Sequence, residues 1–378
     1  MSTPLIYLVA GEPSGDALGA GLMRALRSAL PGARFAGIGG EAMQREGLAS
    51  LFPYRELSVM GFLEVLPHLR SLARRLRETV GDVAANQPAA VVTIDSPGFN
   101  FRLARALKNG PSTRQIKRIH YVAPSVWMYK PKRARQTAEL FDALLALLPF
   151  EPPYFAREGL STTFVGHPVL WESWQGDASA FRTRHSLSQD APLLLLLPGS
   201  RPGEVRRHLP VFLDAARALP AHSPIILAGP LARETILAIA PSNVPVADIA
   251  EKRDAFSAAS LALSKSGTIT LELAAAGVPM IVAHRVSPAS AWLFRRMALL
   301  PYVSLVNIAA NAEIVPELLQ ENCSAACLTD ALDRLSHPEI ARLQREQGQL
   351  ALQRLRGETF AGPHALAARA VVQCLTRR

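Results

Sequence analysis

The sequence predicts an α/β protein with two Rossmann-like domains, each built on a parallel sheet. Strand-length apolar runs alternate with helix-like segments along the chain, and many of these runs are apolar throughout, as strands covered on both faces are. The chain has 378 residues, enough for two full cores. Its 49% hydrophobic and 19% charged residues are typical of a folded soluble protein.

The first series of strands is expected in the N-terminal half. The run Leu5–Gly11 leads into a helix expected near Ala17–Leu30, and Arg34–Gly40 leads into the helical segment EAMQREG. The same alternation continues through Ala89–Asp95, Ile116–Pro124, Ala143–Phe150 and Thr162–Pro168. Alternating strands and helices predict a parallel sheet with helices on both faces.

A second series begins at Leu193–Leu197, five leucines bounded by Pro192 and Pro198. It continues with Pro224–Pro230, Leu261–Gly267 and Val278–His284. The polar stretch Trp171–Asp190 separates the two series. We therefore predict an N-terminal domain over 1–168, a C-terminal domain over 169–345, and a final helical segment over 346–378.

Cysteine usage and apolar run length indicate the compartment. Cys323, Cys327 and Cys374 are too few for a disulfide framework, and no histidine joins them at zinc spacing. No apolar stretch approaches bilayer length, and the N-terminus has no basic segment of a signal peptide. We expect a cytoplasmic protein. There is no Asp-x-Asp motif and no metal-ligand spacing, so we expect no metal cofactor.

The positive charge is concentrated in one region. Residues 55–135 contain 15 Lys plus Arg against 5 Asp plus Glu, whereas the rest of the chain contains 26 of each. This surplus equals the net charge of +10 and predicts a surface for an anionic partner, such as nucleic acid, phospholipid or a phosphorylated substrate.

Two loops of the N-terminal half follow strands at the edge where ligands bind in such sheets. Gly11–Asp16 supplies glycines and the carboxylates of Glu12 and Asp16, although helix capping by Ser14 or Asp16 explains it equally simply. Asp95 directly follows an apolar strand. It is either a base that takes a proton from a hydroxyl or the residue of an Asx turn before Ser96-Pro97.

Two loops of the C-terminal half predict anion binding. Gly199-Ser200-Arg201 follows the leucine strand and precedes a helix that begins at Pro202 or Gly203, with Glu204 in its first turn. Ser266-Gly267-Thr268 repeats this arrangement before a helix that carries Glu272, a candidate for ribose hydroxyls. Helix capping by Ser266 or Thr268 is the simpler alternative. Two such sites suit a diphosphate, held by Arg201 and helix dipoles.

The segment Val59–Glu78 has apolar residues at helical spacing with arginines between them. Most amphipathic helices face a core. Here the apolar part is denser than one face needs and lies in the basic region, so we favour a membrane-surface helix. The residues expected to contact the membrane are Val59, Met60, Phe62, Leu63, Leu66 and Leu69.

With these residues assembled, the chain resembles the lipid-A-disaccharide synthase family nearly end to end. The motifs that carry the resemblance are AGEPSGD, GIGGEAMQREG, VMGFLEVLP, IDSPGFNF, HYVAPSVW, FVGHP, LLPGSRPGEV, SGTITLE and YVSLVNIAANAEIVPELLQ. The resemblance implies a GT-B fold. It also implies inverting transfer of 2,3-diacylglucosamine from its UDP form to lipid X (2,3-diacylglucosamine 1-phosphate), at the cytoplasmic face of the inner membrane of a Gram-negative bacterium.

The resemblance also implies roles for individual residues. Asp95 is the expected base and Glu12 a second catalytic carboxylate, with Ser14, Asp16, Asn100 and Trp127 on the acceptor side. The residues implied for the UDP donor are Gly199, Ser200, Arg201, Glu204, Ser266, Gly267, Thr268, Glu272 and Asn307. In the family the C-terminal segment exchanges between the protomers of a homodimer. This makes Glu317 and Gln320 interface or cleft candidates, and the segment is expected to pack on the N-terminal domain or on a partner protomer.

The chain departs from the family pattern at two places: Gly98 replaces a second Asp, and Asn311-Ala312 replaces a Gly-Arg pair. One rival is a UDP-sugar epimerase, or a transferase acting on another lipid-linked sugar. A nucleic-acid-binding protein is a more distant rival, because recognised modules and aromatic platforms are missing. A nicotinamide dehydrogenase is weaker still, because the chain has no GxGxxG motif.

Overall fold

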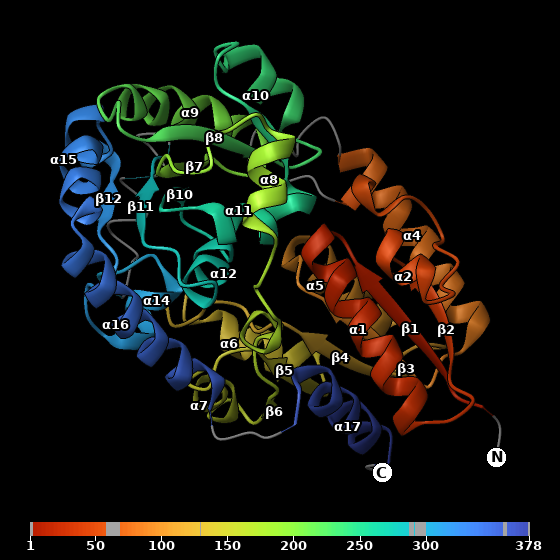
Figure 1. The fold of residues 1–378 in the computed structure, drawn as a ribbon. Helices are drawn as coiled ribbons and strands as arrows, with labels where there is room; N and C mark the ends of the chain where they lie inside the picture. The colour runs from red at the N-terminus through yellow and green to blue at the C-terminus, as the bar shows by residue number, and fades with distance from the viewer. Residues whose placement is uncertain are drawn as a thin grey trace. The chain divides into compact units, whose positions relative to one another are not determined.

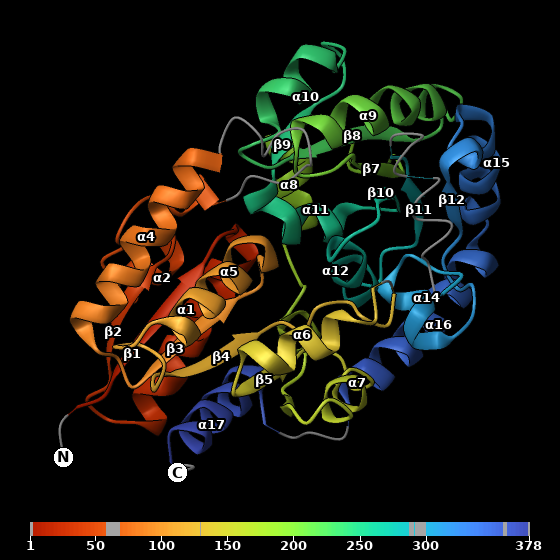
Figure 2. The same cartoon turned by 180° about the vertical axis from the view of Figure 1, so that it is seen from behind.

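The computed structural model describes residues 3–57, 69–128, 130–286, 291, 300–357 and 361–376. The chain divides into two compact units (Figure 1, and from behind in Figure 2). Unit 1 comprises Met1–Pro168 and Gly357–Arg378, and unit 2 comprises Val169–Arg356. The chain returns from unit 2 to unit 1 after residue 356, whereas the sequence predicted a boundary after residue 345. The boundary lies later because α16 (Pro338–Arg356) runs without a break to this point.

Unit 1 contains a six-stranded sheet in the order β2-β1-β3-β4-β5-β6, and every neighbouring pair is parallel. Its strands are β1 (Leu5–Ala10), β2 (Arg34–Ile38), β3 (Ala90–Ile94), β4 (Lys117–Tyr121), β5 (Ala143–Ala146) and β6 (Ser161–Phe164). Its helices are α1 (Pro13–Ala29), α2 (Glu41–Arg45), α4 (Leu69–Asn86), α5 (Pro97–Asn109), α6 (Arg133–Leu140), α7 (Pro152–Ala156) and α17 (Pro363–Thr376), with the short turn η1 (Tyr54–Leu57).

Helices cover both faces of this sheet. Tyr7 and Val9 of β1 pack with α4 and α5, and the same face continues over β5 to α6 and α7. The other face is covered by α1 and by α17, which packs along α1 (Figure 1). The C-terminal helix of the chain is therefore part of unit 1.

Unit 2 contains a second six-stranded parallel sheet in the order β12-β11-β10-β7-β8-β9. Its strands are β7 (Leu193–Leu197), β8 (Ser223–Ala228), β9 (Val246–Asp248), β10 (Leu261–Lys265), β11 (Met280–His284) and β12 (Glu317–Leu319). Its helices are α8 (Ala178–Arg184), α9 (Pro202–Arg217), α10 (Arg233–Ile239), α11 (Lys252–Ala258), α12 (Ile269–Ala275), α14 (Leu305–Ala310), α15 (Ala325–Ser336) and α16. Three short turns complete the chain: η3 (Pro168–Trp171), η4 (Ile249–Glu251) and η5 (Gln320–Asn322).

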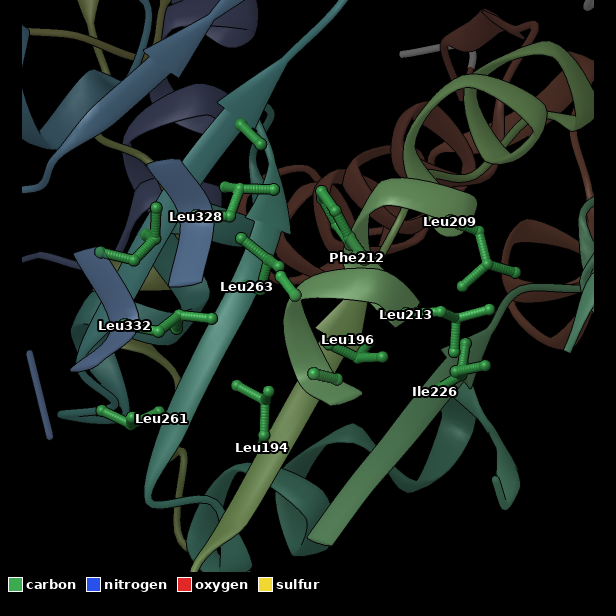
Figure 3. Close-up of a cluster of buried hydrophobic side chains, with 14 of the residues drawn as sticks. Leu194, Leu196, Leu209, Phe212, Leu213, Ile226, Leu261, Leu263, Leu328 and Leu332 are labelled. Carbon is green, nitrogen blue, oxygen red and sulfur yellow. The ribbon is translucent and has the colours of Figure 1, made fainter. Parts of the chain in front are cut away.

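The leucine strand β7 lies inside this sheet, and all five of its residues are buried, as predicted. Figure 3 shows Leu194 and Leu196 among Leu209, Phe212 and Leu213 of α9, with α15 contributing Leu328 and Leu332. Because alternate leucines point to opposite faces, both faces of β7 need a helical cover. This explains the continuous apolar run.

The strand order reverses once in each sheet. In unit 1 the chain runs from β1 outward to β2, and then from β3 outward on the other side. In unit 2 the corresponding reversal lies between β7 and β10. Ligands of such sheets bind at this switch point, outside the carboxyl ends of the strands. All four loops singled out in the sequence follow these four strands.

Three local predictions need correction. The three-residue strands β9 and β12 were not anticipated, since runs this short carry no periodic signal. Helix α1 begins at Pro13, four residues before the expected start. The polar stretch between the two series contains α8, whose Arg182 donates to the carbonyl groups of Ser188, Ala191 and Ala258. It is therefore an integral part of unit 2.

The expected membrane-contact residues Val59, Met60, Phe62, Leu63 and Leu66 lie outside the described residues, and Leu69 begins α4. Among the described helices, none combines the length and apolar character needed to cross a bilayer.

A buried histidine makes the stability of unit 1 depend on pH. His120 stacks on Phe141, bonds Thr93 through Nδ1 and is fully buried, and this burial lowers its pKa from 6.5 to about 3. Between these values the unfolded chain binds a proton that the folded chain does not bind. Stability therefore falls as the pH decreases from 6.5, by up to about 1.4 kcal/mol per pH unit.

We expect His120→Gln to reduce this slope, measured as the opening free energy of β3 and β4 amides by hydrogen exchange between pH 6 and 4. The exposed His337→Gln is the control and should leave the slope unchanged. Equal slopes in all three proteins would contradict the assignment.

Candidate active site

The two loops at the switch point of unit 1 lie against each other. A Cβ atom added to Gly11 would lie 2.9 Å from Ser96 Oγ, so the loop after β1 closely approaches the loop after β3. Glu12 and Asp95 are the residues next to this contact. The structure thus places Glu12 and Asp95, the two predicted catalytic residues, in neighbouring loops at the sheet edge.

The backbone at Asp95 is strained. Asp95 and Ser96 both lie in the left-handed region, with φ of 49° and 45°. Two consecutive non-glycine residues in this region cost free energy, and such strain gathers at functional sites. Asn100, which is buried, donates from Nδ2 to the Asp95 carbonyl at 2.7 Å and to the Ile94 carbonyl at 3.2 Å. Asn100 therefore holds the Asp95 turn in place.

Gly98 lies two residues before Asn100, where the family carries a second Asp. It is exposed, and an added Cβ would meet nothing within 4 Å. A side chain would fit there, so the substitution removes a carboxylate without closing space.

Asp16 bonds the start of the next helix of unit 1. It is buried, and its carboxylate accepts the backbone N–H groups of Gly40 (2.8 Å), Ala42 (2.9 Å) and Met43 (3.0 Å). These donors belong to the first turn of α2, so Asp16 caps that helix from α1. Ser14 lies exposed on α1, whose N-cap residue is Glu12 rather than Ser14 or Asp16.

Trp127 is buried and makes its contacts within unit 1. Only 4% of it is exposed, and its Nε1 donates to Glu151 Oε1 at 3.1 Å. Burial raises the pKa of the Glu151 carboxyl to about 7, although Trp127 and the Leu148 N–H stabilise its charged form. Trp127 therefore anchors its loop, and Glu151 is a titratable group that the sequence analysis did not single out.

The switch point of unit 2 presents an anion-binding loop. Gly199, with φ of +126°, turns the chain out of β7, and an added Cβ would clash with Glu204 at 2.6 Å. Arg201 is the N-cap residue of α9, which begins at Pro202. The N-terminus of this 16-residue helix and the Arg201 guanidinium thus occupy the same corner.

A lysine joins this corner from the neighbouring strand. Lys265 ends β10, and its Nζ lies 3.0 Å from Glu204 Oε1. The other Glu204 oxygen, Oε2, accepts the Ser200 N–H at 3.1 Å. Lys265 links the loops after β7 and β10. No role for this lysine was predicted from the sequence, because its partner is 61 residues away in the chain.

The second anion loop is formed by Ser266, Gly267 and Thr268. Ser266 Oγ donates to the Val303 carbonyl at 3.1 Å, and neither Ser266 nor Thr268 caps α12 through its side chain. Gly267 is exposed with open space around it. Glu272 Oε2 accepts from Lys252 Nζ at 2.7 Å, which adds a further cation to this sheet edge.

Two neutral histidines lie behind the lysine. His208 bonds the Glu204 carbonyl through Nδ1 at 2.8 Å and accepts the Arg285 N–H at Nε2 at 2.9 Å. Burial, together with the Lys265 charge, lowers the pKa of His208 and brings that of His284 to about 4. Both rings are uncharged at neutral pH, so they add no positive charge to that of Arg201 and Lys265.

Asn307 supports a neighbouring loop. Its side chain is fully buried, donates to the Val315 carbonyl and to Glu317, and accepts the N–H groups of Ile314 and Val315. Glu317 accepts in addition the N–H groups of Val303 and Ser304. The Gln320 amide pairs with the backbone of Val286. All these contacts lie within unit 2.

The structure explains one of the two residues, Asn311 and Ala312, that replace the Gly-Arg pair of the family pattern. Asn311 ends α14 with φ of 53°, the left-handed position where glycine and asparagine are the usual residues. The replacement of Gly by Asn is therefore accommodated, whereas Ala312 does remove the charge of an arginine. Within the described residues, no three His, Cys, Asp or Glu side chains gather so that they could hold a metal ion.

Solved structures share this architecture over nearly the whole chain. The glycotransferase of kitacinnamycin superposes with a TM-score of 0.66 at 17% identity and covers 99% of this chain and 100% of its own. The S. aureus MnaA-UDP co-structure also gives 0.66, at 14% identity, covering 98% and 95%. At these identities the likeness concerns the fold alone. The fold is that of the GT-B glycosyltransferases and epimerases.

The chain belongs to the lipid-A-disaccharide synthetase family, whose sequence profile matches residues 6–369. The lipid-A-disaccharide synthase of Granulibacter bethesdensis is 50% identical over 349 residues, which cover 88% of this chain and 87% of that protein. That of Gluconobacter oxydans is 47% identical, covering 90% and 84%. The protein is therefore a disaccharide-forming glycosyltransferase of lipid A biosynthesis, as the sequence predicted.

The capping role of Asp16 is open to a direct test. Asp16→Asn removes a buried charged acceptor from three N–H groups, and we expect it to destabilise the protein by about 1–3 kcal/mol. Glu41→Gln is the matched control, because Glu41 lies exposed in the first turn of α2. It should cost less than about 0.5 kcal/mol. Chemical denaturation compares the two, and equal losses would refute the capping role.

Proposed function

We propose that the protein transfers 2,3-diacylglucosamine from its UDP form to the 6-hydroxyl of lipid X, with inversion and release of UDP. This proposal rests on one observation: the predicted residues lie at the switch points of both sheets. Carboxylates stand at the switch point of unit 1, and cations with a helix N-terminus stand at that of unit 2. A hydroxyl acceptor needs a base, and a leaving diphosphate needs positive charge.

In this mechanism Asp95 accepts the proton of the acceptor hydroxyl. The oxygen forms a bond to the anomeric carbon from the face opposite UDP, and the bond from that carbon to the phosphate oxygen breaks. The electron pair leaves with UDP. Glu12, at the same sheet edge, is the second carboxylate of the acceptor site.

The charge that grows on the diphosphate is balanced by Arg201 and by N–H groups at the N-terminus of α9. The loop Ser266–Thr268 and Glu272 line the same donor site, with Glu272 directed to ribose hydroxyls once Lys252 is displaced. We propose that the reaction needs no metal, so the enzyme assay should proceed equally in EDTA.

The fold alone does not separate this family from the UDP-sugar epimerases. The UDP-GlcNAc 2-epimerase from Neisseria meningitidis bound to UDP-GlcNAc shares the fold with a TM-score of 0.60, at 13% identity. An epimerase changes its sugar nucleotide without a second substrate, whereas the transferase releases UDP only with an acceptor.

We further propose that the enzyme works at the cytoplasmic face of a Gram-negative inner membrane, on anionic lipids. Arg70, Arg74 and Arg77 lie exposed on α4 at positions that share one helix face. Arg75 is instead bonded to Glu56 at 2.6 Å and to Glu78 at 2.7 Å. Three exposed arginines, close in sequence to the apolar segment 59–66, suit a lipid surface better than nucleic acid. Of the three, Arg74 also lies 4.0 Å from Glu56 Oε2.

For assembly we propose a homodimer that exchanges the C-terminal segment. The packing of α17 on α1 supports this, because a partner's α17 would find the same surface there.

Removal of the base should abolish transfer. We expect Asp95→Ala to lower acceptor-dependent UDP release by about 10²- to 10⁴-fold, the usual contribution of a general base. The assay uses purified protein, UDP-2,3-diacylglucosamine and lipid X, with wild type and the exposed Glu158→Gln as references.

Equal UDP release by Asp95→Ala and wild type would mean that another residue is the base, and Glu12→Gln would be the next variant to test. Product formation without lipid X would favour the epimerase. Absence of acceptor-dependent release from folded, UDP-binding protein would refute the substrate assignment.

Membrane binding should depend on the α4 arginines. We expect the triple variant R70A/R74A/R77A to float less with detergent-free vesicles of anionic phospholipid, because each basic residue near such a surface contributes about 1 kcal/mol. The triple variant R334A/R342A/R345A removes three exposed arginines from α15 and α16 as the control. Equal flotation of both variants would contradict the α4 docking surface.

A further inference from the structure

The loop Gly199–Arg201, the N-terminus of α9 and Lys265 form a corner of unit 2 that already holds a negatively charged side chain, that of Glu204. Glu204 Oε2 accepts the Ser200 N–H at 3.1 Å, while Oε1 lies 3.0 Å from Lys265 Nζ and 3.8 Å from an Arg201 guanidinium nitrogen. A phosphate group bound at this loop would use the same three kinds of donor: a backbone N–H, an ammonium and a guanidinium.

Glu204 is charged in this position. Burial by itself raises its pKa, but Lys265, Arg201 and the Ser200 N–H outweigh this effect and hold the pKa of the carboxyl below its ordinary value. Only 16% of the Glu204 side chain and 21% of the Lys265 side chain are exposed. Water therefore screens this pair less than it screens a surface pair.

Lys265 lies where a leaving diphosphate needs a cation. It is the last residue of β10, directly before Ser266, and β10 pairs with β7 at the switch point. Among the described residues, the carboxylate that meets its ammonium group is that of Glu204. His208 and His284, which lie behind it, are neutral and leave the charge of Lys265 uncompensated if Glu204 is displaced.

We infer that Glu204 is an internal stand-in for the diphosphate, and that Lys265 is a further residue that binds it. When the donor enters, Lys265 and Arg201 pass from the Glu204 carboxylate to phosphate oxygens. When UDP has formed, the carboxylate competes for the same cations and favours product release. This inference rests on the proposed UDP-sugar donor. It makes Glu204 an antagonist of UDP binding rather than a ligand of UDP.

The direction in which Glu204→Gln changes the affinity for UDP distinguishes an antagonist of UDP binding from a ligand of UDP. Glu204→Gln keeps a carbonyl oxygen that accepts the Ser200 N–H and removes the competing charge. We expect it to bind UDP about 3- to 10-fold tighter than wild type in calorimetry of the full chain, as expected for losing one part-screened charge. Lys265→Met should bind UDP about 10- to 100-fold more weakly, and Lys265→Arg should stay close to wild type.

The double variant tests the coupling. Lys265→Met should weaken UDP binding more in the Glu204→Gln background than in wild type, because the lysine is then no longer shared with a carboxylate. Asp214→Asn is the control for charge, since Asp214 lies ten residues further along α9 in an exposed pair with Arg217. It should change UDP binding less than twofold.

Weaker UDP binding by Glu204→Gln would overturn the inference and would mean that Glu204 stabilises the loop for UDP binding. An unchanged affinity in Lys265→Met would also overturn it. Inorganic pyrophosphate, which lacks the nucleoside, separates this result from the donor assignment. If wild type binds pyrophosphate but not UDP, the proposed donor fails, and the same order of variants with pyrophosphate still decides the role of Glu204. If wild type binds neither, both fail.

Discussion

The single reversal of strand order in each sheet is the constraint on which the rest of the structure depends. At the reversal, the helices that follow two adjacent strands leave towards opposite faces, so the carboxyl ends of these strands stay open. Unit 1 places Gly11–Glu12 and Asp95–Ser96 at this opening, and unit 2 places Ser200–Arg201 and Lys265–Ser266 there. Loops that lie more than 60 residues apart in the chain become neighbours because parallel pairing brings strand ends to one edge.

Carboxylates with several partners hold these openings in shape. Asp16 fastens α2 to α1, Glu317 fastens the segment 303–307 to β12, and Glu204 ties α9 to the loop before it. Each accepts backbone N–H groups that would otherwise have no partner at a helix or loop end. A polar residue in a motif of this family is therefore as well explained by support of the loop as by contact with substrate. Asn100 and Asn307 follow the same rule through their amides.

The sequence predicted the architecture well because its signals are local. Continuous apolar runs such as Leu193–Leu197 identify buried parallel strands, and a proline with small residues marks the turn into α9. The edge strands β9 and β12 were missed because three residues carry no period. Tertiary partners were missed for a different reason: nothing local tells that Lys265 meets Glu204, that Asp16 caps another helix, or that Trp127 bonds Glu151. Spacing predicts where a side chain stands along the chain, whereas its partner is set by strand order.

The two openings differ in charge, and this difference suits a displacement reaction. The opening of unit 1 carries Asp95 on a strained turn and Glu12 in the neighbouring loop. The opening of unit 2 carries Arg201, Lys265 and a helix N-terminus, while its histidines stay neutral. The same fold supplies both kinds of opening, because the geometry of a switch point does not depend on the sign of the charge that its loops carry.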